Sequence, residues 1–224
     1  MDARYGEGVM TKRLGIIGAG KVGTTVGRLA LAAGWQVRIA ASGRQPLQGL
    51  IVETMLPGAT LLPEAEVVAD SDIIVLAVPL SKVHQLDLGA LSGKVVVDAM
   101  NHWYPVDGAL DGLKPGDAST AWVAGLNPQM RLVKSLNHLG YHDMETDARP
   151  EGHPERRGVA VASDDAGANA LVAGLLNDLG FDPVELPASA GVHLQGDSPI
   201  FGRWVDAPGL RSAIAACADR PSEP

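Results

Sequence analysis

The stretch Arg13-Leu-Gly-Ile-Ile-Gly-Ala-Gly-Lys-Val-Gly-Thr-Thr-Val-Gly27 decides which fold this chain can adopt. An apolar run that predicts a strand enters a turn with glycines in the G-x-G-x-x-G spacing, and a helical pattern follows. In this spacing the first glycine permits a tight turn, the second lets backbone approach a pyrophosphate, and the third lets the helix pack on the strand. The N–H groups of the helix N-terminus bind the phosphates. The predicted cofactor contacts in this turn are Gly18, Ala19, Gly20, Lys21, Val22 and Gly23.

The sequence after the turn favours a dinucleotide site over a purely structural glycine turn. Apolar residues from Val22 to Ala33 recur at helical spacing, and Gly34 is suited to end the helix. Residues 36–41 then predict a second strand. A strand, a glycine-rich turn, a helix and a strand in this order form the β-α-β unit that binds dinucleotides.

The end of the second predicted strand indicates which dinucleotide binds. A fold that prefers NAD usually places an acid about 20 residues beyond the glycines, where it binds the ribose 2′-hydroxyl. Here that position is Ser42, and no acid occurs before Glu53. Because a hydroxyl and a guanidinium bind a 2′-phosphate that a carboxylate would repel, Ser42 and Arg44 predict NADP(H). The alternative is a solvated turn, which the same residue types also suit.

The rest of the chain alternates predicted strands and helices, which indicates an α/β fold. Residues 73–78 and 94–99 are apolar runs of the kind found in central parallel strands covered on both faces. Ligands of such sheets bind beyond the carboxyl ends of the strands, so we expect cofactor contacts where these two strands end. These contacts are Ala77, Val78, Pro79 and Asn101.

We therefore expect an NAD(P)-binding Rossmann fold, a doubly wound and mostly parallel sheet with a small C-terminal α/β extension. Residues 1–11 are expected to be a disordered extension, residues 12–135 the NADP-binding domain, and residues 136–224 a small acceptor-binding and dimerisation region. Within the last region, residues 198–205 and 210–218 carry more apolar side chains than a small segment easily hides. They predict a homodimer, unless these side chains fold back on their own domain.

Composition excludes several classes of protein. Hydrophobic residues make up 46% of the 224 residues, as in globular proteins, and the apolar runs are too short to span a membrane. The net charge of −8 argues against nucleic acid as a partner. The single cysteine, Cys217, excludes an internal disulfide and a site of several thiolates, and the cytoplasm is the expected location.

Six motifs give the chain a resemblance to a known family. They are Ile16-Ile-Gly-Ala-Gly-Lys-Val-Gly23, Ser42-Gly-Arg44, Val75-Leu-Ala-Val-Pro79, Val95-Val-Val-Asp-Ala-Met-Asn101, Leu132-Val-Lys-Ser-Leu-Asn-His138 and Leu179-Gly-Phe-Asp-Pro-Val-Glu185. With these motifs, residues 12–211 resemble the coenzyme F-420-dependent NADP reductases and their bacterial relatives. The resemblance implies a homodimer and hydride transfer between NADP and C5 of a deazaflavin. It also implies that residues 135–139 and 189–195 lie beside the nicotinamide.

Hydride transfer between two bound rings depends on alignment and on exclusion of water, and it needs no nucleophile. Asn137 and His138 are the candidate positioning residues. His138 can donate to a ring carbonyl, or it can be a strand-end histidine bonded to backbone. Some family members have a histidine where Asn137 aligns, whereas here the histidine comes one residue later. His138, His142 and Asp143 raise the alternative of a metal site, but the family needs no metal and none is expected.

Several other side chains have two interpretations. Trp103 and Tyr104 can stack on a flat ring or pack at the edge of the domain. Arg156 and Arg157 can meet an anionic tail of the acceptor or lie in a solvated loop. His193 lies in a glycine-containing loop that can reach the acceptor, or it can be a surface residue.

Two classes of function fit these features. The first is an NADP-dependent oxidoreductase that passes hydride to coenzyme F-420 or a similar small acceptor. The second is a non-catalytic NADPH-binding redox sensor that signals through its C-terminal half. The compact second half lacks a DNA-binding helix and a charged interaction tail in its sequence pattern, which favours the enzyme.

Overall fold

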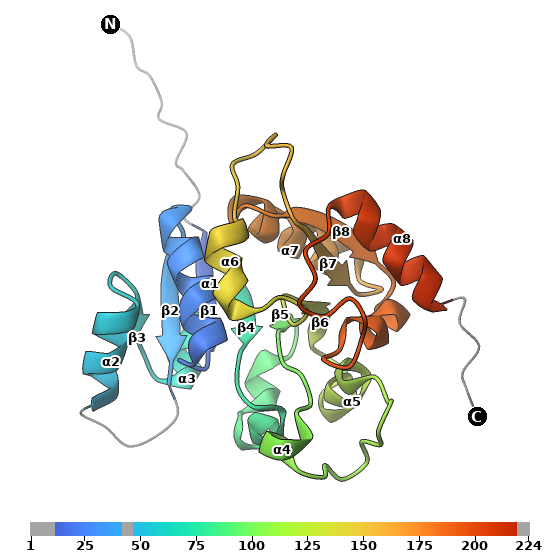
Figure 1. Ribbon diagram of the computed structural model, residues 1–224. Helices are drawn as coiled ribbons and strands as arrows, with labels where there is room; N and C mark the ends of the chain where they lie inside the picture. The colour runs from blue at the N-terminus through green and yellow to red at the C-terminus, as the bar shows by residue number, and fades with distance from the viewer. Residues whose placement is uncertain (1–11, 42–46, 219–224) are drawn as a thin grey trace, which may run out of the picture.

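The computed structural model describes residues 12–41 and 47–218 (Figure 1). The first half of the chain contains β1 (Arg13–Ile17), α1 (Lys21–Ala32), β2 (Gln36–Ala40), α2 (Leu47–Met55), β3 (Thr60–Leu61), α3 (Glu64–Ala69), β4 (Ile73–Leu76), η1 (Leu80–Gln85), η2 (Leu88–Leu91) and β5 (Val95–Asp98). The second half contains α4 (Tyr104–Asp107), α5 (Ser119–Leu126), β6 (Arg131–Ser135), α6 (Tyr141–Asp147), β7 (Gly158–Ala162), α7 (Ala166–Asp178), β8 (Asp182–Leu186), η3 (Ala188–Leu194) and α8 (Ala207–Ala218). The strands and helices predicted from hydrophobic periodicity are present.

The strands form one sheet in the order β3-β2-β1-β4-β5-β6-β7-β8. Every neighbouring pair is parallel except β6 and β7, which pair antiparallel through Lys134 with Ala162 and Ser135 with Val161. The chain leaves β1 toward one edge of the sheet and returns to add β4 on the other side of β1. The predicted α/β, doubly wound, mostly parallel Rossmann fold is therefore confirmed, and the switch point lies between β1 and β4.

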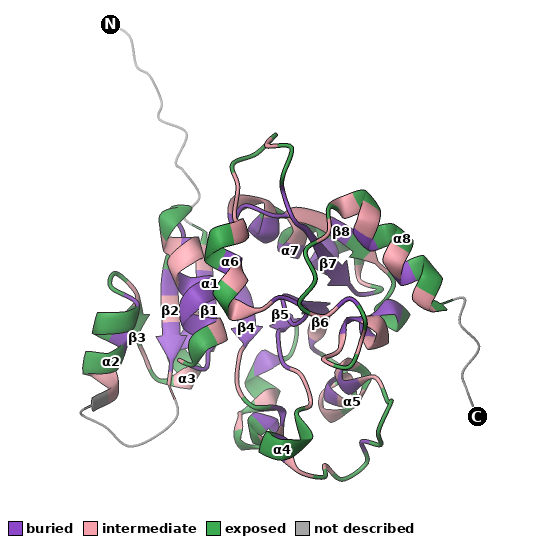
Figure 2. Ribbon diagram, in the orientation of Figure 1, coloured by how far each residue is buried: buried purple, intermediate pink, exposed green. Residues whose placement is uncertain are grey.

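Helices cover both faces of the sheet, which explains the wholly apolar strands (Figure 2). Every residue of β4 and β5 is buried. One core cluster packs β1, β2 and α1 together with α7, and a second packs the opposite faces of β4 and β5 against η1 and α5. Because such strands bury side chains on both faces, they have no polar alternation along their length.

The C-terminal region extends the same sheet rather than forming a second one. β7 and β8 continue from β6, and α8 packs on them. Leu210 and Ile214 of α8 are 0% and 6% exposed, and they join a cluster with Ile200 from the preceding loop. Most apolar side chains of residues 198–218 thus pack within their own chain, as in the alternative to a second subunit, and the homodimer itself stays a prediction. Trp204 remains 49% exposed.

The two arginines at the end of the 147–157 loop are core residues. Arg156 is 2% exposed, and its Nε donates to Asp182 Oδ1 at 2.6 Å. Arg157 is 1% exposed, and its Nη1 donates to Asp147 Oδ2 at 2.6 Å. Both interpretations of this pair are therefore wrong, because the arginines neither reach an acceptor nor lie in solvent. A buried guanidinium needs such partners to offset its lost hydration.

Candidate active site

A groove follows the carboxyl ends of the strands on both sides of the switch point. Its first part is a cavity of about 320 Å³ beside the glycine-rich turn. The lining residues come from the ends of β1, β2 and β4 and from α2: Gly18, Ala19, Gly20, Ala41, Gln48, Ile51, Val52, Ala77, Val78 and Pro79. This is the place where a doubly wound sheet binds a dinucleotide.

The three glycines of the turn have separate physical roles. Gly18 has φ +116°, and a Cβ there would lie 2.4 Å from the carbonyl oxygen of Ala77. A Cβ at Gly23 would lie 2.0 Å from the carbonyl oxygen of Gly18, so any side chain would push α1 off the turn. A Cβ at Gly20 would meet nothing within 4 Å. The first and third glycines are thus required by the fold, whereas the second leaves open space where a pyrophosphate can approach backbone.

The start of α1 fits an anion. Gly20 is the N-cap residue and has no side chain to bond the free N–H groups of the first turn. That turn contains no acid, and it begins with the exposed Lys21. Free N–H groups and the positive end of a helix bind phosphate. Lys21 Nζ donates to the hydroxyl of Tyr141 at 2.9 Å, which links the turn to the start of α6.

The pair predicted to bind the 2′-phosphate, Ser42 and Arg44, lies outside the described residues. β2 ends at Ala40, and Ala41 lines the cavity directly before that segment. The chain therefore enters that segment at the edge of the cavity, and binding of the 2′-phosphate stays a prediction.

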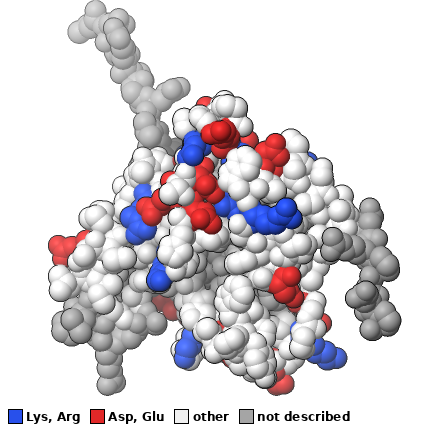
Figure 3. All heavy atoms as spheres, viewed as in Figure 1, with Lys and Arg blue, Asp and Glu red and all other residues white. Residues whose placement is uncertain are grey.

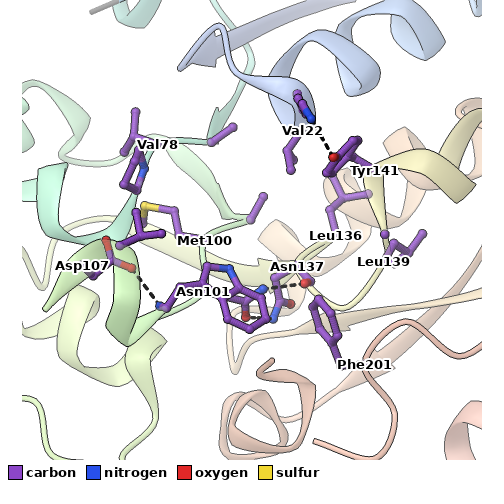
Figure 4. Close-up of a pocket in the computed structure, with 17 residues that line it drawn as sticks. Val22, Val78, Met100, Asn101, Asp107, Leu136, Asn137, Leu139, Tyr141 and Phe201 are labelled. Atoms are coloured by element: carbon purple, nitrogen blue, oxygen red, sulfur yellow. Dashed lines mark hydrogen bonds between the residues drawn. The ribbon is translucent and has the colours of Figure 1, made fainter. Parts of the chain in front are cut away.

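The second part of the groove is a cavity of about 500 Å³ (Figure 4). It adjoins the first part at Ala77, Val78 and Pro79, which line both. Its walls come from the first turn of α1, the ends of β4, β5 and β6, helix α4 with the residue before it, the start of α6, and the loop before α8. The lining residues are Lys21, Val22, Ala77, Val78, Pro79, Ala99, Met100, Asn101, Trp103, Val106, Asp107, Leu136, Asn137, Leu139, Gly140, Tyr141 and Phe201. Its size is typical of small-molecule sites.

Two asparagines meet at one side of this cavity, as Figure 4 shows. Asn101 Nδ2 donates to the carbonyl oxygen of Asn137 at 2.7 Å, and Asn137 Nδ2 donates to Asn101 Oδ1 at 3.0 Å. Asn137 Nδ2 also donates to the carbonyl oxygen of Leu194 at 2.7 Å. Asn137 Oδ1 has no hydrogen-bond partner in the described part of the chain. The predicted residues Asn101 and Asn137 therefore lie together in the cavity.

The backbone is strained where β6 delivers Asn137. Leu136 has φ 65°, and among the described residues it is the single non-glycine residue with positive φ. This conformation costs a residue with a Cβ of the order of 1–3 kcal/mol, and such strain clusters at functional sites. The bend places both Leu136 and Asn137 on the cavity wall.

An aromatic pair forms another part of the cavity wall. Trp103 and Phe201 meet edge to face, with ring centroids 5.4 Å apart. Trp103 also lies against the loop at Gly196, where a Cβ would be 2.3 Å from its ring. Asp107 holds this wall in place, since it accepts hydrogen bonds from the backbone N–H groups of Trp103 and Ser81 at 2.8 and 2.9 Å. Trp103 thus packs on the C-terminal loop and also lines the cavity, and its stacking on a flat ring stays a prediction.

His138 lies outside the cavity, in contrast to its neighbour Asn137. It is 1% exposed, and the backbone N–H of Ala160 approaches its Nε2 at 3.5 Å. Burial, together with the charges of Arg157 and Lys134, lowers the pKa of His138 to about 3. The predicted contact with a ring carbonyl is therefore corrected: a neutral imidazole in the core has a structural role.

The other histidines also lie away from the cavity lining. His142 is exposed and its ring lies 4.0 Å from that of Tyr141, whereas His138 is buried. Within residues 12–41 and 47–218 no group of three possible metal ligands is found. His193 belongs to η3, where Ala190 and Gly191 are buried. Residues 189–195 do not line this cavity in the described structure, but the carbonyl of Leu194 accepts from Asn137, which does. Their approach to the acceptor stays a prediction.

The sequence patterns missed several cavity residues. Tyr141 and Phe201 both line the cavity but belong to segments with no recognised motif. Tyr104, which was grouped with Trp103, is 67% exposed and lines a neighbouring depression instead.

On the face shown in Figure 3, charged side chains gather over α1 and α6, where Arg28 pairs with Glu145 at 2.8 Å. The cavity itself is mostly apolar, which suits a flat ring.

Comparison with known proteins agrees with this geometry. Residues 13–102 match the family model described as NADP oxidoreductase, coenzyme F420-dependent. This match confirms the family resemblance over β1 to the loop after β5 and supports an NADP-dependent oxidoreductase. No curated protein matches the chain in sequence. No helix among the described residues is long and apolar enough to cross a membrane.

Solved structures share the fold along most of the chain. A hypothetical protein from Sinorhizobium meliloti is 29% identical, with a TM-score of 0.71 over 88% of this chain and 95% of that chain. A putative F420-dependent NADP reductase from Arthrobacter sp. is 25% identical, with a TM-score of 0.66 over 81% of this chain and 87% of that chain. An imine reductase from Myxococcus stipitatus, solved with NAD+, is 17% identical, with a TM-score of 0.57 over 93% of this chain and 61% of that chain. The last likeness shows the fold alone.

Proposed function

We propose that this chain, whose residues 13–102 match the coenzyme F420-dependent NADP oxidoreductases, transfers hydride between NADP(H) and a deazaflavin or a similar flat acceptor. The observation that carries the proposal is the junction of two cavities at Ala77, Val78 and Pro79. One cavity adjoins the glycine-rich turn, and the other has amide groups and aromatic rings in its walls. A dinucleotide bound across the switch point would span both.

Each part of the groove has a task in this reaction. NADPH, when bound, supplies a hydride from C4 of its nicotinamide ring. The turn at Gly18–Gly23 holds the pyrophosphate, and Ser42 with Arg44 holds the 2′-phosphate. Asn101 and Asn137 orient the reacting rings through their amides. The hydride goes from C4 of the nicotinamide to C5 of the acceptor, and the proton that completes the reduced acceptor ring comes from solvent.

The acceptor half of the cavity favours a planar ring. Trp103, Phe201 and Tyr141 supply aromatic surface, and Leu136 with Leu139 supplies aliphatic surface. Apolar walls exclude water, which protects a hydride in transit, and rigid walls keep the two reacting carbons ~3–3.5 Å apart. A deazaflavin accepts hydride at C5 and matches these demands. We include in the proposal that the protein acts as a homodimer.

Deuterium transfer tests the proposal directly. NADPH carrying deuterium at C4 is mixed with the oxidised deazaflavin in a stopped-flow instrument, and the product is examined by mass spectrometry. We expect deuterium at C5 of the product and a slower transient with deuterated NADPH. Turnover of another flat acceptor but not the deazaflavin would keep the oxidoreductase and remove this acceptor. Tight NADPH binding without turnover of any acceptor would contradict the enzyme and favour the redox sensor.

A further inference from the structure

A lysine is buried at the carboxyl end of β6, close to the cavity but not in its lining. Lys134 is 1% exposed and Asp98 of β5 is 0% exposed. The two residues are direct partners in the β5–β6 register, and Lys134 Nζ lies 3.1 Å from Asp98 Oδ2. Burial lowers the pKa of Lys134, and the facing carboxylate opposes that shift. Since replacing a buried ion pair by apolar residues is often neutral or stabilising, stability alone does not account for this pair.

The ion pair holds one peptide segment of the cavity wall. Lys134 Nζ donates to the carbonyl oxygen of Met100 at 2.5 Å, and the N–H of Met100 donates to Asp98 Oδ1 at 3.0 Å. Both polar backbone groups of Met100 are thus bound by charged side chains. Thr120 Oγ1 donates to Asp98 Oδ2 at 2.6 Å, which fixes the carboxylate from a third element.

The residue after this segment is Asn101, which bonds to Asn137 across the cavity. Lys134 therefore lies where two loops originate: it binds the loop after β5 through Met100, and its own strand continues through the strained Leu136 to Asn137. Lys134 is closed from solvent, since it is 1% exposed, and Gly191 of η3 lies against its side chain. No other described side chain bridges the two loops with a charge.

We propose that Lys134 is a positioning residue for hydride transfer: with Asp98 it fixes the Met100–Asn101 peptide, and so the amide pair Asn101–Asn137, against the reacting rings. This inference rests on the proposed function. Its physical reason is that a displacement of about 1 Å between reacting groups costs roughly 100-fold in rate, and an amide pair on two loops tolerates no free movement of either loop.

The test compares Lys134→Met with Lys94→Met. Met has a similar length and suits a buried place, but it donates no hydrogen bond. Lys94 directly precedes β5, at the end of the strand away from the cavity. Its Nζ donates to the carbonyl oxygens of Ala69 and Ser71, so Lys94→Met also removes a lysine that binds backbone carbonyls and serves as the control. We expect Lys134→Met to lower kcat for hydride transfer by roughly 10- to 100-fold with KM for NADPH changed less than about threefold. Lys94→Met should change neither by more than about twofold.

A second measurement separates positioning from a general loss of structure and needs no turnover. The adenosine half of the cofactor, 2′,5′-ADP, lacks the nicotinamide ring that the proposed binding mode of NADPH places beside the Asn101–Asn137 pair. We expect Lys134→Met to keep the affinity for 2′,5′-ADP but to lose the fluorescence enhancement of bound NADPH. If the wild-type protein turns over no acceptor, the proposed function fails, and this spectral readout still decides the role of Lys134.

Three results would overturn the inference. They are an unchanged kcat in Lys134→Met, an unchanged NADPH emission in that variant, and an equal loss in Lys94→Met. Asp98→Asn keeps the shape of the site and removes the charge, and it replaces Lys134→Met if that variant does not fold. The same split between kcat and KM is expected of it, and an equal fall in affinity for 2′,5′-ADP would contradict positioning.

Discussion

Asn101 and Asn137 exchange hydrogen bonds of 2.7 and 3.0 Å between the loops that follow two neighbouring parallel strands. Because Asn137 also donates to the carbonyl of Leu194, this one amide joins both Rossmann loops to the C-terminal region. Its Oδ1 keeps an unused acceptor in the described structure. The two amides are therefore polar groups held in place by hydrogen bonds in the wall of a mostly apolar cavity.

Removal of the Asn137 amide should therefore affect both catalysis and stability. We expect Asn137→Ala to lower kcat by roughly 10- to 100-fold through loss of alignment. It should also lower the free energy of unfolding by about 1–3 kcal/mol, because Asn101 Oδ1 and the Leu194 carbonyl lose their donor. Asn169→Ala on α7 is the control, since that buried amide donates to the carbonyl of Ser163, which precedes the helix. Steady-state kinetics and urea unfolding give both quantities, and equal kinetic losses in the two variants would refute the assignment.

Cofactor preference should depend on the segment between β2 and α2. We expect NADP(H) to bind at least ~10-fold more tightly than NAD(H), or ~1.4 kcal/mol, through Ser42 and Arg44. Arg44→Ala should remove most of this preference, while Arg203→Ala, an exposed arginine elsewhere, should leave it unchanged. Isothermal titration calorimetry with both cofactors measures it. Equal affinities in the wild-type protein would contradict the 2′-phosphate site.

The sequence predicted the cofactor half of this groove more fully than the acceptor half, for a physical reason. The turn at Gly18–Gly23 is local: its glycine spacing, the close approach of Gly23 to the Gly18 carbonyl, and the helix that follows all belong to consecutive residues. The acceptor half joins residues far apart in sequence, such as Trp103 and Phe201, and only tertiary packing brings them together. His138 was misplaced because the backbone bends at Leu136, after the end of β6, and the sequence does not show which side chains face the cavity beyond such a bend.

Acid should destabilise the protein partly through His138. Its pKa is about 3 in the folded state and about 6.5 in an unfolded chain, so the unfolded state binds more protons below pH 6.5. Stability from the neutral imidazole is therefore present above pH 6.5 and falls by up to about 1.4 kcal/mol per pH unit as the pH drops toward 3. His138→Gln should show a shallower pH dependence in urea unfolding between about pH 5 and pH 7.5. The kcat of this variant should change less than about threefold. A large fall in kcat would contradict the structural role and indicate that His138 takes part in the reaction.

A homodimer remains a prediction, and the exposed Trp204 is the residue best placed to test it. Leu210 and Ile214 are buried within their own chain, whereas Trp204 is 49% exposed. We expect light scattering at micromolar concentration to give twice the chain mass, and Trp204→Ser to weaken the dimer. Leu171→Ser, which changes a similarly exposed apolar residue on α7, is the control. A chain-sized mass for the wild-type protein at all concentrations would exclude the dimer.

The aromatic wall should control acceptor binding without affecting the cofactor. Trp103 is 41% exposed, lines the larger cavity and meets Phe201 edge to face, while Gly18 and Gly20 line the smaller cavity. Aromatic contacts contribute about 0.5–1.5 kcal/mol beyond their buried area, so Trp103→Ala should raise KM for the acceptor by at least roughly 3- to 10-fold. The Kd for NADPH should stay within about twofold.

Two variants are controls for Trp103→Ala. Trp103→Phe keeps a flat ring and should recover part of the loss, and Trp122→Phe, on α5 beside His84, should have no effect. Acceptor titrations at saturating NADPH, with NADPH affinity measured separately by fluorescence, distinguish the two terms. A loss of NADPH affinity equal to the rise in acceptor KM would show that Trp103 supports the whole groove rather than the acceptor site.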